Sequence, residues 1–172
     1  ARVQEIETIR LQNRNISFIP QWFENLNNLR HLYIISCHNL HTLPDIFYGT
    51  PSMEFLSIIE TPIEYLPKSA ESLHNLKKLY INTPSMNLTT FNFSQMTLLE
   101  EVGFGTIKSL VLSDSVGTLS NLRSLVVYSC GNFESVPSWI YNLKGLEDLR
   151  MIDTGLFFGD TFIFRFACIK NA

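Results

Sequence analysis

The sequence has little charge, with only 17% of its 172 residues being Asp, Glu, Lys or Arg, against about 25% in a typical soluble domain. The 13 basic and 16 acidic residues give a net charge of −3. This composition argues against a disordered tail and against a nucleic-acid module that works by neutralising phosphates. Because 45% of the residues are hydrophobic, we expect one domain with a continuous core.

Long apolar stretches are also absent. No uninterrupted run reaches the roughly 18 residues that a membrane helix requires, and no signal-peptide-like run follows Ala1. We therefore expect a soluble domain with no membrane span. The missing initiator methionine suggests a piece of a longer protein.

Cysteine is scarce as well. Cys37, Cys130 and Cys168 cannot complete a disulfide framework, and none lies in a CxxC pair. The simpler interpretation is a reducing, cytoplasmic compartment. The alternative is secretion, because three N-glycosylation sequons begin at Asn15, Asn87 and Asn92.

Catalytic signatures are missing. There is no GxSxG elbow, no HExxH helix and no paired-carboxylate arrangement. Gly103-Phe104-Gly105 lacks the further glycine and the strand-turn-helix context of a phosphate loop. We therefore expect no enzymatic activity, no catalytic residues and no cofactor in this chain.

What the sequence does contain is a repeat. An LxxLxL pattern recurs with successive spacings of 23, 24, 23, 23, 23 and 24 residues. Units one to seven begin at Ile6, Leu29, Met53, Leu76, Leu99, Leu122 and Leu146. The fourth and sixth residues are apolar in every unit, and an apolar residue followed by proline recurs in four second halves. The extra residue of each 24-residue unit lies just after the LxxLxL segment, near Cys37 and Cys130.

The pattern resembles the leucine-rich repeat family with the consensus LxxLxLxxNxLxxLPxxFxxLxx, over residues 6–159. The consensus Asn at the ninth position is replaced in all seven units. Residues 29–44 and 122–137 are similar to the LxxLxLxxCxxLxxLP units of plant intracellular nucleotide-binding immune receptors.

The resemblance implies an α/β solenoid, a curved horseshoe segment. About seven short parallel strands would line its concave face, with loops or short helical turns on its convex face. Each unit is too small to bury its own apolar side chains, so neighbouring units must stack to form the core. We assign residues 1–160 to this domain. Unit four has Thr89-Thr90 in place of Leu-Pro, and we expect a distorted loop there.

Residues 161–172 form a C-terminal cap or tail in this interpretation. Phenylalanines alternate at Phe162, Phe164 and Phe166, which predicts a strand within residues 161–169. The segment either closes the last unit or docks on a missing neighbour, and we favour the cap.

Because side chains alternate in a strand, the third, fifth and seventh residues of each unit should point onto the concave face. Several are large and apolar, which is typical of interaction sites. The alternative is that these side chains only cover one another along the sheet. Gly103 and Gly105 should leave a notch, most simply a tolerated gap. The candidate partner-binding residues are Tyr33, Ile35, Phe55, Ile59, Tyr80, Val126, Tyr128 and Arg150.

Two polar clusters attract attention. Asp148, Arg150 and Asp153 lie close together in unit seven, where a solvated charged face is the simpler interpretation. Metal-ligand residue types also gather in unit two, at His31, Cys37, His38 and His41. The repeat register places His31 on the concave face and Cys37 in the core, and it places His38 and His41 in the turn that follows. We therefore expect no metal site.

The resemblance implies a non-catalytic protein-recognition domain of an intracellular immune-type receptor. It would bind a protein partner or another domain of its own chain, and not nucleic acid. The alternative function is a substrate-docking or scaffold segment of a larger enzyme or effector.

Overall fold

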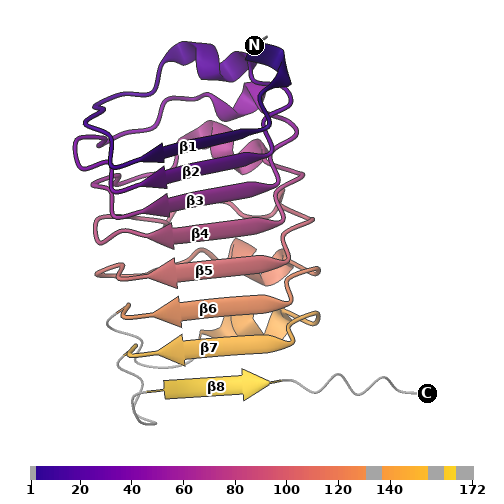
Figure 1. Ribbon diagram of the computed structural model, residues 1–172. Coiled ribbons are helices and arrows are strands. Elements are labelled where there is room, and N and C mark those ends of the chain that lie inside the picture. The colour runs from indigo at the N-terminus through magenta and orange to yellow at the C-terminus, as the bar shows by residue number, and fades with distance from the viewer. Residues whose placement is uncertain (1–2, 131–136, 155–160, 166–172) are drawn as a thin grey trace.

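The computed structural model describes residues 3–130, 137–154 and 161–165 (Figure 1). Its strands form a single eight-stranded sheet whose spatial order follows the chain. Seven neighbouring strands run parallel, and the eighth runs antiparallel to the seventh. The strands are β1 (Thr8–Gln12), β2 (His31–Ile35), β3 (Phe55–Ile59), β4 (Lys78–Asn82), β5 (Glu101–Gly105), β6 (Ser124–Tyr128), β7 (Asp148–Ile152) and β8 (Thr161–Arg165).

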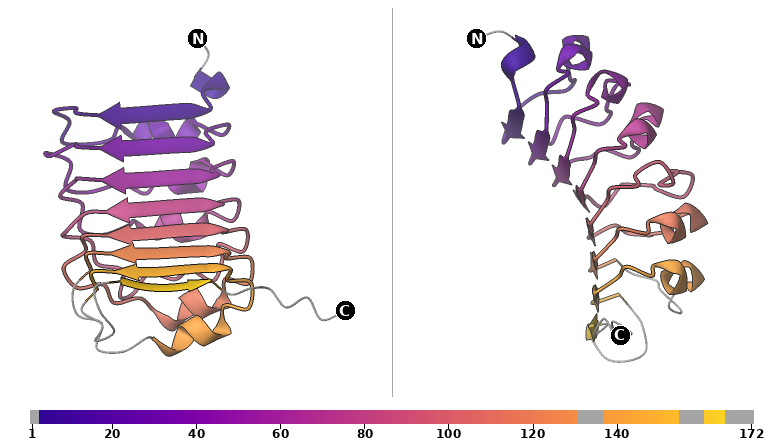
Figure 2. Two further views of the ribbon diagram at one scale, coloured as in Figure 1. Left: turned by 60° about the horizontal axis from the view of Figure 1, so that its bottom comes forward. Right: turned by 90° about the vertical axis from the view of Figure 1, so that its right-hand side faces the viewer.

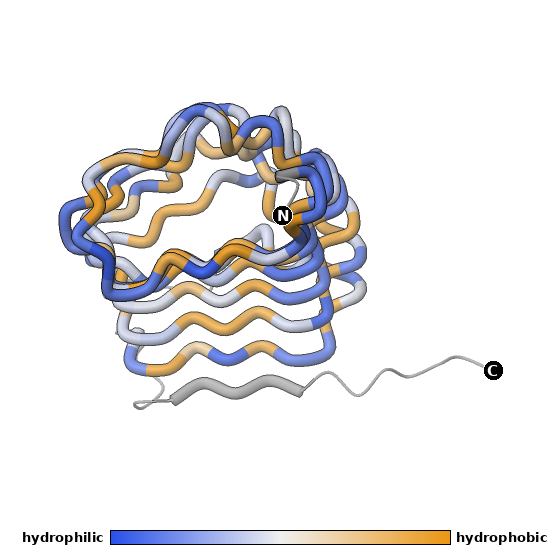
Figure 3. The backbone as a smooth tube through the Cα atoms, turned by 45° about the horizontal axis from the view of Figure 1, so that its top comes forward, coloured by the Kyte–Doolittle hydropathy of each residue, from blue (hydrophilic) through white to orange (hydrophobic). Residues whose placement is uncertain are grey.

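The seven parallel strands pair in phase with the repeat. Leu32 lies opposite Leu56, and Leu56 lies opposite Leu79, so equivalent residues form columns across the sheet. The fourth and sixth residues of units two to seven, which lie in β2 to β7, are buried, as the sequence predicts. Ile9 and Leu11 in β1 are only partly buried, because β1 is the first strand of the stack. Seen obliquely from the β1 end, hydrophobic residues recur along successive strands (Figure 3).

The convex side carries short 3-10 helices, which confirms the expected loops or helical turns. Figure 2 shows the strands along one side of the arc and the helices fanned out on the other. Pro20, Pro67 and Pro137 immediately precede η2, η4 and η6, and proline has neither the N–H nor the φ freedom to prolong a central strand. The helices are η1 (Val3–Glu5), η2 (Gln21–Asn25), η3 (Phe47–Gly49), η4 (Lys68–Ser72), η5 (Asp114–Thr118) and η6 (Ser138–Asn142).

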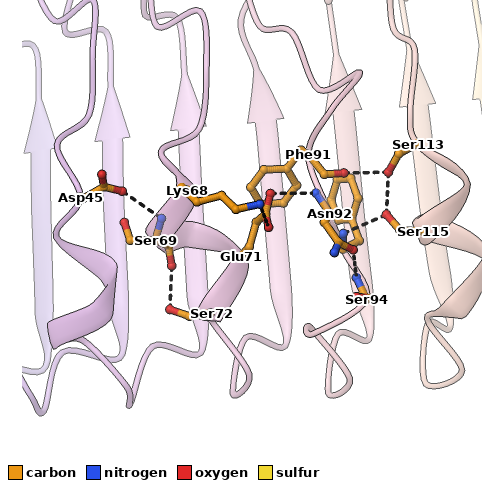
Figure 4. Close-up of polar contacts among 11 residues, drawn as sticks. Asp45, Lys68, Ser69, Glu71, Ser72, Phe91, Asn92, Ser94, Ser113 and Ser115 are labelled. Atoms are coloured by element: carbon orange, nitrogen blue, oxygen red, sulfur yellow. Dashed lines mark hydrogen bonds and ion pairs between the residues drawn. The ribbon is translucent and has the colours of Figure 1, made fainter.

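Unit four differs from its neighbours, as expected. No helix lies between β4 and β5, a segment that is described throughout. Polar contacts to the neighbouring units hold this loop instead (Figure 4). The Ser113 hydroxyl donates to the Phe91 carbonyl oxygen at 2.7 Å. The Asn92 backbone N–H donates to the Glu71 carboxylate at 3.2 Å.

The strands end in a repeated left-handed turn. The eighth residue of six units has a positive φ of 48° to 53°, and none of these residues is glycine. They are Asn13, Ser36, Glu60, Thr106, Ser129 and Asp153. This conformation is unfavourable for residues with a Cβ. The energetic cost is offset where the backbone N–H of the same residue adds one more hydrogen bond to the neighbouring strand. The Ser36 N–H, for example, donates to the Ile59 carbonyl oxygen at 2.9 Å.

Unit four again lacks this feature. Its eighth residue, Thr83, has no positive φ and is buried, while Pro84 at the consensus asparagine position is exposed. The Thr83 hydroxyl donates to the Thr61 carbonyl oxygen of unit three. A buried side-chain hydrogen bond therefore takes the place of the left-handed turn.

An asparagine ladder follows the amino edge of the sheet, directly before the first leucine of three units. Asn28, Asn75 and Asn121 each donate a side-chain N–H to the backbone carbonyl oxygen 24 residues earlier in the chain, at 2.6, 2.9 and 2.7 Å. Bridging of this kind satisfies backbone oxygens that lie outside the sheet ladder.

The second residue of each unit carries a charge whose sign alternates along the stack. In order these residues are Glu7, Arg30, Glu54, Lys77, Glu100, Arg123 and Glu147. Glu54 pairs with Arg30 on one side and with Lys77 at 2.9 Å on the other. The hydrogen bond from Lys77 is the main cause that lowers the pKa of the Glu54 carboxyl.

Some expectations concern residues outside the described ranges. The extra residue expected near 131–133, the apolar residue Val136 and Cys168 fall there. A strand is confirmed for Thr161–Arg165, and residues 166–169 of the expected strand are not described. That residues 161–172 act as a cap stays a prediction.

Two adjacent leucines test whether burial between units stabilises the fold. Leu99 is fully buried, whereas Leu98 is 43% exposed. We expect Leu99→Ala to lower the free energy of unfolding by about 2 to 5 kcal/mol, because it leaves a cavity between units. Leu98→Ala should change it by about 0.5 kcal/mol or less. Urea denaturation followed by circular dichroism measures both values, and equal losses would contradict the assignment.

Candidate binding face

The concave face consists of the third, fifth and seventh residues of each unit, which are the first, third and fifth residues of each five-residue strand from β1 to β7. In β2, Tyr33 and Ile35 are half-buried while Leu32 and Ile34 between them are fully buried. The same alternation recurs in β4 and β6. The strand geometry therefore places all eight candidate residues on one side of the sheet, where the sequence predicts them. That they bind a partner stays a prediction.

Three aromatic side chains form a row across β2 to β4, and we call Tyr33, Phe55 and Tyr80 the aromatic row. The ring centroids of Tyr33 and Phe55 lie 4.7 Å apart, and those of Phe55 and Tyr80 lie 5.6 Å apart. Both pairs are tilted, within the range that favours aromatic contact. Each of the three residues is half-buried, so part of each stays accessible. The row is thus both an internal ladder and an accessible surface.

A small residue makes the row possible. Tyr33 and Tyr80 occupy fifth positions, and the fifth position between them is Ser57. Phe55 comes from the third position of the same strand and contacts both tyrosine rings. Ser57 is only 3% exposed despite its outward position. The neighbouring side chains therefore leave almost none of Ser57 accessible to solvent.

The glycines of β5 do not leave the expected notch, which is a correction. A Cβ on Gly103 would lie 2.7 Å from Cδ1 of Tyr80, and a Cβ on Gly105 would lie 2.1 Å from Cζ of Tyr128. The two tyrosines lean over β5 from opposite sides and fill the space that the missing side chains leave. Sequence spacing could not foresee this, because it does not report the direction in which a long side chain leans.

Tyr80 also takes part in a polar cluster beside the aromatic row. Its hydroxyl donates to the Glu101 carboxylate at 2.7 Å, and Lys78 pairs with the other carboxylate oxygen at 2.8 Å. Burial, followed by the nearby carboxylate, raises the pKa of Tyr80 to about 12. The hydrogen bond from Lys78, then that from Tyr80, lowers the pKa of Glu101. This arrangement fixes the Tyr80 ring.

The remaining candidates surround the row or lie beyond β5. Ile35 and Ile59 are opposite each other in β2 and β3. Val126 and Tyr128 lie in β6, and burial is the main cause that raises the pKa of Tyr128. Arg150 pairs with Asp148 at 2.7 Å and lies three strands beyond Tyr80. The eight candidates thus form two groups, on β2 to β4 and on β6 to β7.

Sequence reasoning placed Arg10 on the concave face but did not include it among the candidates. Its guanidinium carbon lies 4.1 Å from the centroid of the Tyr33 ring. The in-phase pairing of Arg10 with Tyr33 is the signal that could have identified it. Arg10 extends the aromatic row by one strand.

The histidines and the first cysteine of unit two do not converge. His31 lies on the concave face with Nδ1 at 3.2 Å from the Thr8 hydroxyl. Cys37 is fully buried, whereas His38 and His41 are exposed. Within the described residues, no three His, Cys, Asp or Glu side chains gather as metal ligands do.

Cys37 and Cys130 are free, buried thiols, as the sequence predicts for small core residues. Burial raises the pKa of the Cys130 thiol, which keeps it in the less reactive protonated form. In the part of the chain that the structure describes, no helix has the length and apolar character needed to cross a bilayer.

A double-mutant cycle tests how tightly Tyr128 covers Gly105. The Cβ of Gly105→Ala would overlap the Tyr128 ring. We expect this substitution to lower the free energy of unfolding by about 1 kcal/mol or more, as overpacking does. In a Tyr128→Ala background the loss should disappear, because the ring is gone. Denaturant unfolding of the four proteins gives the coupling energy. A cost that is the same in both backgrounds would contradict the contact.

Carboxyl-carbon NMR titration tests the Lys78–Glu101 contact. The pKa of Glu101 should lie below its ordinary value of 4.5 and should rise toward that value in Lys78→Met. Lys77→Met is the matched control, because Lys77 contacts Glu54 instead. Since the folded-state pKa is lowered, the stabilisation is present above pH 4.5 and is lost as the pH falls through the folded value. Equal values in all three proteins would exclude the interaction.

Comparisons with known proteins agree with this geometry. No protein-family model matches the sequence, and no curated protein matches it significantly. Among solved structures, the leucine-rich repeat domain of the type III effector XopL is 26% identical, with a TM-score of 0.59. The alignment covers 84% of this chain and 52% of that one, so this chain spans about half of its length.

Two further structures share the fold at lower identity. TLR13 in its complex with ssRNA13 is 17% identical, with a TM-score of 0.60 over 90% of this chain and 27% of that chain. The plant peptide hormone receptor RGFR1 in complex with RGF2 is 14% identical, with a TM-score of 0.58 over 89% of this chain and 29% of that chain. The seven-unit repeat, the in-phase parallel sheet and these likenesses together show a leucine-rich repeat domain, folded as a curved solenoid.

Proposed function

We propose that this domain is a non-catalytic recognition module that binds a protein segment on its concave face. The single observation that carries the proposal is the aromatic row, whose three large side chains are held in place and are only half-buried, so that part of each stays accessible. Residues of this kind supply most of the binding energy at protein interfaces. Because the rings already pack against one another, binding would cost little side-chain entropy. The proposal requires no metal or cofactor.

A protein partner is favoured over nucleic acid. The chain carries a net charge of −3, and of the three Lys and Arg residues on the concave positions of β1 to β7, Lys78 and Arg150 are paired with carboxylates. A nucleic-acid surface needs several unpaired cations to release counterions from phosphates. Because TLR13 forms a complex with ssRNA13, single-stranded RNA belongs among the ligands to be tested.

The biological setting that we favour is an intracellular immune-type receptor in a reducing compartment. The free thiols of Cys37 and Cys130 support that compartment. In such a receptor the concave face would bind a foreign protein or another domain of the same chain.

A second candidate is a scaffold or substrate-docking segment of an effector. It is favoured by the 26% identity to the effector domain of XopL. The complete sequence separates the two candidates: a P-loop nucleotide-binding domain beside the repeats supports the receptor, and a ligase or kinase domain supports the scaffold.

Site-specific photo-crosslinking tests the binding face. A benzophenone amino acid placed at Tyr33 should crosslink a partner in a lysate of the source cells. The same amino acid at Tyr48 is the control, because Tyr48 is exposed in η3 on the convex side. Crosslinks that form only at position 48 would overturn the concave assignment.

Substitution of the aromatic row then measures its contribution. We expect Tyr33→Ala with Phe55→Ala to weaken binding of the crosslinked partner by about tenfold or more, as loss of interface anchors does. Tyr48→Ala with Tyr141→Ala removes two exposed convex rings and should leave the affinity unchanged. Calorimetry gives both affinities, and thermal unfolding verifies that each variant is folded. Unchanged affinity in the Tyr33 and Phe55 variant would refute the proposal.

A further inference from the structure

Arg10 differs from the other charged residues of the concave face. It is exposed, and its guanidinium lies over the Tyr33 ring, 4.1 Å from the centroid. Among the described residues it has no ion-pair partner, whereas Lys78 pairs with Glu101 and Arg150 pairs with Asp148. The concave positions of β1 to β7, which the structure describes in full, therefore carry one uncompensated charge. It is positive, and it lies at the end of the aromatic row.

The stacked position prepares Arg10 for a carboxylate. A guanidinium that lies over a ring satisfies its π-face by the cation–π contact and leaves its N–H groups, which point outward in its plane, free to donate. Those donors match the two oxygens of a carboxylate in a bidentate pair. Stacking on Tyr33 also restricts the side chain before any partner arrives, so less rotamer entropy is lost on binding.

The size of the row sets the length of the partner segment. β1 and β4 are separated by three strand spacings, or about 14 Å. An extended peptide rises about 3.3 Å per residue, so about four or five residues cover that distance. A peptide that crosses the strands would thus place one end at Arg10 and the other at Tyr80.

We propose that the concave face takes an extended protein segment in which an Asp or Glu side chain is followed, or preceded, within four or five residues by large apolar side chains. The carboxylate pairs with Arg10, and the apolar side chains lie on the aromatic row. This inference rests on the proposed function and adds the chemistry of its partner.

An acidic peptide fits the Arg10 end of the aromatic row better than a phosphodiester chain does. Arg10 is a single cation, and the exposed carboxylate side chains of Glu5 and Glu7 belong to the same unit or directly precede it. On β2 to β7, a polyanion that followed the face beyond Arg10 would meet only Lys and Arg side chains that are already paired with carboxylates. In a peptide with one carboxylate and neighbouring apolar side chains, the carboxylate can pair with Arg10 and the apolar side chains can lie on the aromatic row.

The test uses the whole chain and a displayed library of random twelve-residue peptides. We expect the selected peptides to be enriched in Asp or Glu within five residues of aromatic or aliphatic side chains. A synthetic copy of the most enriched peptide should bind Arg10→Glu about tenfold or more weakly than the native chain. Arg14→Glu is the control; it makes the same charge change at an exposed residue of the same unit, after the end of β1.

Charge reversal makes the test specific. A peptide in which Lys replaces the acidic residue should bind Arg10→Glu better than it binds the native chain. Tyr33→Ala with Phe55→Ala should abolish binding of every selected peptide. If selected peptides need Tyr33 and Phe55 but show no acidic enrichment and bind Arg10→Glu unchanged, the carboxylate inference fails while the proposed function stands. If they depend on neither, or if single-stranded RNA binds the face and the peptides do not, both fail.

Discussion

The structure depends on one constraint: no unit can remove its own apolar side chains from water, so each relies on its neighbours. Leu32, Leu56 and Leu79 are buried only because adjacent strands stack in phase. Parallel pairing of equivalent residues follows from this, as do the short helices on the outer side and the elongated shape. Stability is then transmitted from unit to unit, and a defect in one unit weakens its two neighbours first.

The same stacking determines what the concave face can be. Outward side chains on neighbouring strands lie close enough to contact one another, so large residues fill the places where a neighbour is small. Ser57 is buried between Tyr33 and Tyr80 of the neighbouring strands, Tyr80 covers Gly103, and Tyr128 covers Gly105. The rings hold each other in fixed positions while part of each stays accessible. A surface that stabilises itself in this way is already arranged before a partner arrives.

The repeat period predicted the strands, the buried columns and the side of the sheet on which Tyr33 and Tyr80 lie. A period records which way each Cβ points and nothing more. The direction of a long side chain depends on the volume of residues about 23 positions away, which is why the filled glycine gap and the stacked Arg10 were missed. The left-handed eighth residues were likewise missed, because Ser, Glu and Thr occupy four of the six positions and only Asn13 and Asp153 are of types that often adopt this conformation.

The alternating charges at the second position restrict how the solenoid can change in length. Glu54 meets a basic residue in the unit on either side. Deleting unit four alone would bring Glu54 beside Glu100, and inserting a single unit with a charged second residue between two existing units would likewise create a pair of like charges. Units added or removed two at a time preserve the alternation. For recombination between repeats, or for a designer who wishes to lengthen the binding face, the interchangeable module is therefore a pair of units.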